Sequence, residues 1–352
     1  MKLINVLSIL FFFAVTSCSM EDSMMSDTEK EMPVASDNQM VLSFTLNGGT
    51  TTKATETPEK PTDNEAAINN CIIFLLDNSD NVIGVTEKPA ETMDMKILTK
   101  VRTGLKAVAI VNASDADRSK FKACATRSDI NSVLVDGSSN DGTAPSALLK
   151  TGEINVNIPT EFKGTSSTTP TDANTITVEI PVKQRTARIE LSAFSVVFKD
   201  ESKATTSLTH TINSVMLSNQ AISTYAFSEP TVGKESWYGS EKMEKTSNPV
   251  FYAYQNTKES KLENNQSVSA YTTMTIKYTY TTQSKKEVTA TKEFPIITSG
   301  LAENNLNGNK VIAGCSYKIR VNIEITSVDV EANVQYEVLS FTNVNVDVPD
   351  FN

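Results

Sequence analysis

Residues 40–54 read MVLSFTLNGGTTTKA, an apolar segment followed by a polar linker. Every second residue at the start of this segment is large and apolar: Met40, Leu42, Phe44 and Leu46. Successive side chains of an extended strand point to opposite faces, so these four side chains share one face. The segment is therefore predicted to be a strand that contributes to a hydrophobic core.

The linker after this strand begins at Gly48-Gly49 and continues with threonines. It contains one basic residue, Lys53, which is followed by the small residue Ala54. Two interpretations are open at this point. The segment is either an ordinary first strand with its loop, or a strand that is attached to the fold by a cleavable linker.

The composition predicts an all-β protein with little helix. The chain has 352 residues, enough for two domains, and it is rich in Thr, Ser, Asn and Val. A net charge of -10 argues against nucleic acid or an anionic membrane surface as a partner. The chain has one histidine, His210, and it lacks a Gly-rich phosphate loop and a nucleophile elbow. We therefore expect no enzyme activity, no cofactor and no metal site.

Residues 1–17 have the features of a secretory signal peptide. Lys2 is basic, and the apolar run 3–15 is too short to span a bilayer as a helix. The run ends in Val-Thr-Ser before Cys18, the pattern of a bacterial lipoprotein whose cysteine sulfur takes the diacylglycerol. A lipid on Cys18, with its palmitate-type acyl chains, predicts anchoring to the outer membrane; the alternative is a plain signal peptide with a chance cysteine. Residues 18–38 form an acidic tether that is expected to be disordered.

Three cysteines remain besides Cys18, namely Cys71, Cys124 and Cys315. An odd number allows at most one intramolecular disulfide, and no pair has metal-ligand spacing. Cys71 begins the apolar run CIIFLL, and Cys315 precedes a predicted strand. We expect these cysteines to be structural thiols.

Two β-sandwich domains are predicted in tandem. The first covers residues 39–180 and includes the removable first strand 39–53, whereas the second covers residues 181–330. Near their junction, Arg185 and Arg188 are expected to be edge or solvent-facing charges. Apolar runs and period-two alternation predict strands in both domains.

Residues 331–352 are predicted to form two further strands. Alternating apolar residues define the first of them: Ala332, Val334, Tyr336 and Val338. The second alternates at Val344, Val346 and Val348 and ends at Pro349. These strands either belong to their own sheet or are donated to another molecule, because the last strand has the same one-faced pattern as the first.

Several segments together carry a resemblance to a known family. They are the lipoprotein motif ending at Cys18, the strand 41–46 with Lys53-Ala54, the strand 107–112, the segment 182–191, and the strand 316–325 with the two terminal strands. In order and spacing the chain resembles the fimbrillins, the major subunits of Bacteroidia-type (type V) pili.

The resemblance implies a mechanism of assembly. The precursor would reach the cell surface as a lipoprotein, and an arginine/lysine-specific surface protease would cut between Lys53 and Ala54. Cleavage in the family is commonly at arginine, whereas the residue here is a lysine. Residues 39–53 would then contain a plug strand. Once this strand and its side chains Met40, Leu42, Phe44 and Leu46 are released, a hydrophobic groove would remain. The C-terminal donor strands of another copy or a related pilin, with Val344, Val346 and Val348, would fill it and build a head-to-tail adhesive filament.

Two alternatives remain open at the level of the sequence. The chain could be a surface glycan-binding lipoprotein that stacks sugars on Trp237 and Tyr238. It could also be a tip adhesin of the same pilus rather than a stalk subunit.

Overall fold

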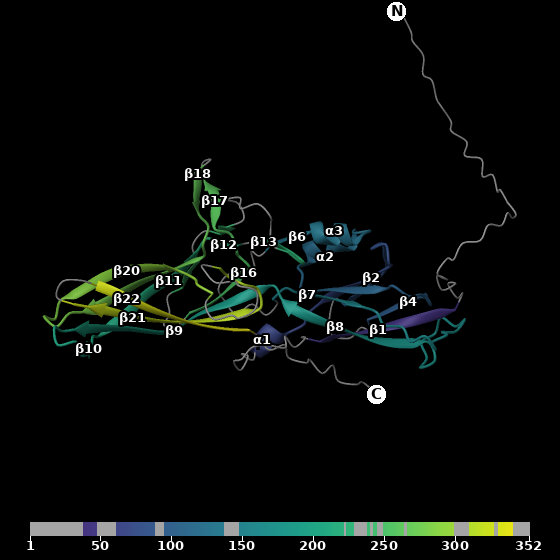
Figure 1. The fold of residues 1–352 in the computed structure, drawn as a ribbon, viewed down its shortest axis with the longest axis horizontal. Helices are drawn as coiled ribbons and strands as arrows, with labels where there is room; N and C mark the ends of the chain where they lie inside the picture. Colours follow the sequence, from purple (N-terminus) through teal and green to yellow (C-terminus); the bar gives the residue numbers. More distant parts are fainter. Residues whose placement is uncertain are drawn as a thin grey trace, which may run out of the picture. The chain divides into compact units, whose positions relative to one another are not determined.

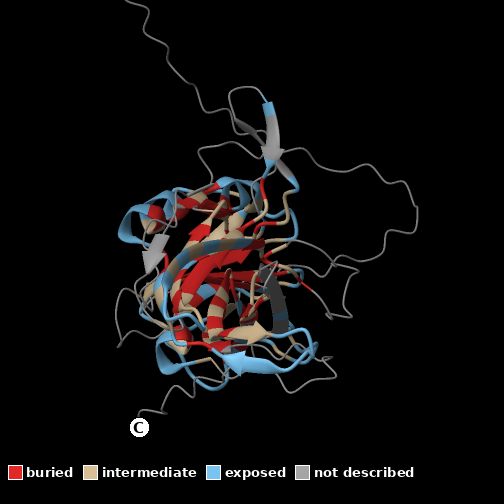
Figure 2. Cartoon of the chain, turned by 90° about the vertical axis from the view of Figure 1, so that its left-hand side faces the viewer, coloured by how far each residue is buried: buried red, intermediate tan, exposed pale blue. Residues whose placement is uncertain are grey.

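The computed structural model describes residues 38–47, 61–88, 95–136, 148–221, 223–228, 238–239, 242–244, 249–263, 266–298, 310–326 and 330–340. These ranges form an all-β protein with three short helices, which confirms the predicted fold class (Figure 1). Buried residues lie on strands in the middle of the view down the long axis, and exposed residues lie mostly around its periphery (Figure 2). Within the described ranges, no helix combines the length and apolarity needed to cross a membrane.

The N-terminal half is built on a seven-stranded mixed sheet in the order β3-β2-β5-β7-β8-β1-β4. Its strands are β1 (Gln39–Asn47), β2 (Cys71–Leu76), β3 (Val82–Lys88), β4 (Lys96–Lys100), β5 (Lys106–Val111), β7 (Lys150–Asn155) and β8 (Thr175–Gln184). β2 is buried along its whole length because both faces of the sheet are covered. A Cβ built on Gly84 of β3 would lie 2.6 Å from Cγ2 of Ile97 of β4. The two ends of the sheet therefore approach each other, and the sheet encloses its own core.

Three capped helices accompany this sheet: α1 (Asp63–Ala66), α2 (Asp115–Lys122) and α3 (Arg127–Ser132). The side chains of Thr62, Ser114 and Thr126 accept hydrogen bonds from the first turns, as expected for N-caps. α2 and α3 cover the second face of the sheet, where Phe121 and Ile130 are fully buried.

The C-terminal half is a sandwich of two sheets. One has the order β14-β12-β16-β9-β21-β22 with β10 added to β9, and the other has the order β15-β11-β19-β20. The first sheet contains β9 (Thr186–Lys199), β10 (Thr205–Ser207), β12 (Gln220–Ala221), β14 (Tyr238–Gly239), β16 (Val250–Tyr254), β21 (Cys315–Ile325) and β22 (Val330–Ser340). The second contains β11 (His210–Ser218), β15 (Lys242–Glu244), β19 (Thr273–Thr281) and β20 (Glu287–Pro295).

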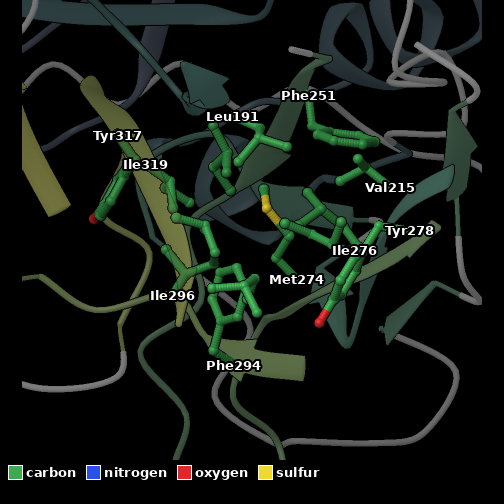
Figure 3. Close-up of a cluster of buried hydrophobic side chains, with 14 of the residues drawn as sticks. Leu191, Val215, Phe251, Met274, Ile276, Tyr278, Phe294, Ile296, Tyr317 and Ile319 are labelled. Carbon is green, nitrogen blue, oxygen red and sulfur yellow. The ribbon is translucent and has the colours of Figure 1, made fainter. Parts of the chain in front are cut away.

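The core of this sandwich comes from the inward faces of both sheets. Figure 3 shows Leu191 and Ile319 of the first sheet together with Val215, Met274 and Ile276 of the second. All five side chains are fully buried. The period-two pattern of β19 and β21 places alternate residues in this core, as the sequence predicts.

Two small two-stranded sheets complete the fold. β6 (Leu134–Asp136) pairs with β13 (Ser223–Tyr225), so a strand of the N-terminal half joins one of the C-terminal half. β17 (Ser260–Glu263) pairs with β18 (Gln266–Ser269) as a hairpin.

The junction between the halves lies at Arg185, where β8 ends and β9 begins. The expected boundary between residues 180 and 181 instead falls inside β8. The strand continues because Val182 is buried in the same core as Ile180 and pairs with Gly152. Gly152 permits this close approach, since a Cβ there would overlap the carbonyl of Pro181. The described residues of both halves belong to one compact unit.

A buried polar cluster spans this junction. Glu65 of α1 is 1% exposed and accepts a hydrogen bond of 2.6 Å from the hydroxyl of Tyr252 on β16. Nε of Arg188 lies 3.8 Å from the Glu65 carboxylate, and its Nη2 lies 2.7 Å from Glu190. The expectation that Arg188 is solvent-facing is wrong, because α1 covers this part of β9 and its carboxylate pairs with the guanidinium. Such pairing reduces the cost of burying charge.

Lys150 contributes to the same region. Its Nζ donates a hydrogen bond of 2.8 Å to the carbonyl of Ala67, and the residue is 8% exposed. Burial lowers the pKa of Lys150 from 10.5 to about 8, although the negative charge of Glu65 opposes this shift. The protonated lysine is therefore less stable in the folded protein than in water.

This shift predicts how stability depends on pH. Because the folded-state pKa is the lower one, the unfolded chain binds more protons between pH 8 and 10.5. The difference in free energy of unfolding between the wild type and Lys150→Met should rise by about 1.5 kcal/mol from pH 8 to pH 9.5, because the folded lysine is already half deprotonated at pH 8. Urea titrations at the two pH values measure it. Lys183→Met, on the exposed side of β8, is the matched control. If the free energy of unfolding changed with pH equally in both variants, the lowered pKa of Lys150 would be contradicted.

Candidate assembly site

β1 lies inside the N-terminal sheet rather than at its edge (Figure 1). It runs parallel to β8, with residues 41–47 opposite residues 175–181. It runs antiparallel to β4, with residues 39–43 opposite residues 96–100 in reverse order. An N-terminal segment of the described chain therefore occupies a slot between two strands that come later in the sequence.

The four alternating side chains of this strand are all in the core. Met40 and Leu42 are 0% exposed, Phe44 is 3% exposed and Leu46 is 5% exposed. They make up four of the sixteen buried residues of the cluster that β1 shares with β2, β4, β5 and β8. Burying four such side chains stabilises the fold by about 6–12 kcal/mol in gross terms. A typical net stability is about 5–15 kcal/mol, so the loss of β1 would remove much of it.

Of the strands in this sheet, β4 is the one that depends most on β1. Among the described strands, β1 is the one to which β4 is hydrogen-bonded in a ladder. Ile97 of β4 packs into the same core as β1. Without β1, the neighbouring edges of both β4 and β8 would lose their partner, and unpaired edges readily accept another strand.

A loop holds the first residues of β1 by their backbone. The N–H of Gln39 donates to the carbonyl of Thr165 at 2.6 Å, and the N–H of Thr165 donates back at 3.0 Å. The N–H of Val41 donates to the carbonyl of Asn174 at 2.7 Å. The sequence did not predict this role of the loop, because a backbone contact leaves no signature in side-chain patterns.

The structure describes only part of the residues singled out in the sequence. Cys18, Lys53 and Ala54 lie outside the described ranges, as do Trp237 and the three valines of the last predicted strand, Val344, Val346 and Val348. Tyr238 lies in β14, without a described side chain. Processing, lipidation and sugar binding at these positions therefore stay predictions.

The first of the two predicted C-terminal strands is observed as β22. It pairs antiparallel with β21 over eleven residues, from Val330 opposite Ile325 to Ser340 opposite Cys315. β22 ends the path of its sheet. In the described structure it thus belongs to its own subunit.

The described cysteines are free thiols, and two of them are buried. Burial raises the pKa of Cys71 and of Cys315 to about 11. Across the part of the chain that the structure describes, no group of three or more His, Cys, Asp or Glu side chains is placed to hold a metal ion.

No protein-family model matches the chain. No curated protein sequence matches it either. Solved structures do. A fimbrilin from Porphyromonas gingivalis W83 aligns over 87% of this chain and 98% of its own, with a TM-score of 0.56 and 13% identity. The fold is that of the fimbrillins.

Two candidate cell adhesion proteins share this fold. One from Parabacteroides distasonis aligns with a TM-score of 0.54 and 15% identity, over 85% of this chain and 99% of its own. One from Bacteroides eggerthii aligns with a TM-score of 0.53 and 17% identity, over 88% and 98% of the two chains. The fimbrillin resemblance seen in the sequence is therefore confirmed at the level of the fold.

Substitutions in β1 test its place in the core. We expect Leu42→Ala to lower the free energy of unfolding by about 2–5 kcal/mol, because the fully buried side chain would leave a cavity. Ser43→Ala, at the neighbouring half-buried position of the same strand, is the control and should change stability by less than about 1 kcal/mol. Urea denaturation of the uncut chain measures both. Similar losses in the two variants would show that the strand is not seated as described.

Proposed function

We propose that this protein is a structural subunit of a cell-surface fimbria and that it polymerises by exchange of β1 for a strand of another subunit. The position of β1 carries the proposal. It is a buried interior strand, yet it lies at the N-terminal end of the described fold and is followed by a segment with a protease-sensitive residue type. The shared fold with the fimbrilin of P. gingivalis supports this function.

The proposed route begins with export as a lipoprotein. Cys18 would carry the lipid that holds the precursor on the outer membrane, and residues 18–38 would serve as its tether. A lysine/arginine-specific surface protease would then cut between Lys53 and Ala54. Lys60, the other basic residue of segment 48–61, precedes Pro61, and trypsin-like enzymes cut such bonds poorly. This leaves Lys53 as the natural target in the segment.

The energetics of the groove support polymerisation after the cut. Departure of β1 would expose a strip of core and the facing edges of β4 and β8. The C-terminal segment of the next subunit, with Val344, Val346 and Val348, would bury the strip again. Each subunit would then accept a strand at one end and donate one at the other. Such a head-to-tail contact does not close on itself and therefore produces a filament.

Controlled cleavage of the purified precursor tests this function. Limited digestion with a lysine-specific protease should yield a new N-terminus at Ala54, found by N-terminal sequencing, and oligomers, found by size-exclusion chromatography and electron microscopy. The oligomers form because the cut removes the covalent link that keeps β1 in its slot.

Two variants separate the steps of this reaction. Lys53→Gln should remain uncut at this position and monomeric. A chain ending at Ser340 should be cut but should not polymerise, because it lacks the predicted donor strand. The proposal fails if the wild-type chain, once cut at Lys53, stays a stable monomer at high concentration.

A further inference from the structure

A lysine and an asparagine meet inside the N-terminal half, next to α1. Nζ of Lys150 and Nδ2 of Asn112 each donate a hydrogen bond of 2.8 Å to the carbonyl oxygen of Ala67. The carbonyl oxygen of Leu148 lies 3.5 Å from Nζ and 3.1 Å from Nδ2. Because the two nitrogen atoms share two acceptors, the amine and the side-chain amide lie close to each other.

Neighbouring strands bring these two residues together. β5 and β7 pair antiparallel with Val111 opposite Lys150, and Asn112 follows Val111 directly. The φ of Asn112 is 59°, in the left-handed region that asparagine adopts more readily than most residues. Asn112 and Lys150 are both buried, so little water reaches the pair.

The side-chain carbonyl of Asn112 is polarised by two main-chain donors. Its Oδ1 accepts hydrogen bonds from the N–H groups of Asn69 and Asn70, at 2.8 and 3.4 Å. Two N–H groups on one carbonyl oxygen favour negative charge on that oxygen, as they do in an oxyanion hole. The carbon of this amide, Cγ, is therefore open to attack by a nucleophile.

Lys150 has the properties of such a nucleophile. Its described hydrogen bonds end on main-chain carbonyls. Burial lowers its pKa to about 8, so at neutral pH a larger fraction of this amine is uncharged than of a lysine in water. The buried carboxylate of Glu65, on α1, acts on Lys150 through its negative charge. A carboxylate in such a place is suited to accept and return a proton.

We propose that Lys150 and Asn112 join in an intramolecular isopeptide bond that the folded chain forms by itself. The flexible lysine stem lets Nζ move from the shared carbonyls to Cγ of Asn112. The Nζ–Cγ bond forms, and negative charge develops on Oδ1, where the N–H groups of Asn69 and Asn70 stabilise it. The Cγ–Nδ2 bond then breaks. Glu65 takes the proton that Nζ loses and passes it to Nδ2, which leaves as ammonia.

The bond would connect the end of β5 to the start of β7. It would close residues 112–150 into a covalent loop that contains α2 and α3. A cross-link of this kind restricts the unfolded chain and so favours the folded one. β1 lies outside this loop, and the inference does not depend on the strand exchange proposed above.

Peptide mapping of the full chain tests this bond. The chain is purified in urea, where the fold that brings the two side chains together is absent, and is then refolded. Samples from before and after refolding are denatured and digested with trypsin, alongside a chain purified without urea. Trypsin cuts after a free Lys150 but not after a lysine whose amine is in an amide. The bond should therefore yield residues 107–118 joined to residues 128–163.

We expect this joined peptide in the refolded and the natively purified chains and not in the chain kept in urea. Its mass should be about 17 Da below that of the two separate peptides, because ammonia has left. Lys150→Met should abolish it, whereas Lys183→Met, at an exposed position of β8, is the matched control and should retain it. The proposal is overturned if the natively purified wild type yields residues 107–118 and 128–150 only as separate peptides.

A conservative variant tests the part played by Glu65. Glu65→Gln keeps an oxygen for the hydroxyl of Tyr252 but loses the basic carboxylate. It should slow formation of the joined peptide after refolding by about a hundredfold. An unchanged rate would overturn the proton transfer assigned to this carboxylate.

The same map identifies the state of Lys150 in the urea titrations. An amide nitrogen does not titrate in this pH range, so the pH dependence expected for Lys150 belongs to chains in which the lysine is still free. Cross-linked chains should lack that dependence.

Discussion

The rest of the N-terminal half depends on the burial of four alternating side chains of β1 between β4 and β8. A sheet tolerates the loss of an edge strand much better than the loss of an interior one, because an interior strand pairs on two sides. β1 also supplies a quarter of the buried cluster that lines its face of the sheet. The absence of this strand would therefore remove a quarter of the cluster and leave two neighbouring strands without a partner on one side, although it joins its sheet from the N-terminal end of the described chain.

The two neighbours of β1 bind it in different ways. β8 pairs with residues 41–47 and β4 with residues 39–43, so the two ladders overlap at residues 41–43. The loop of residues 161–174 adds backbone hydrogen bonds to Gln39 and Val41 at the start of the strand. The end near Leu46 is held mainly by β8 and by core packing. The first residues of β1 therefore have more backbone partners than its last residues, which continue into the covalent link that follows Asn47.

The junction between the halves has a different physical basis. Here Glu65, Arg188, Glu190 and Tyr252 place charges and a hydroxyl in an environment with little water. Such a network requires a defined geometry, since each buried charge depends on its partner. It joins α1, which follows the segment with Lys53, to β9 and β16 of the C-terminal half. None of these residues lies in β1, so removal of β1 would leave this connection in place.

The sequence by itself determined the all-β class, the strand at residues 40–46 and its single apolar face, because period-two alternation is a local property of the chain. It also indicated, from apolar runs and period-two alternation, that both halves are built of strands. Only the tertiary structure decided that β1 lies between β4 and β8, that β8 continues through Pro181, and that Arg188 is largely buried. These features depend on pairing between residues far apart in the chain, and no local pattern encodes which distant backbone or carboxylate will be the partner.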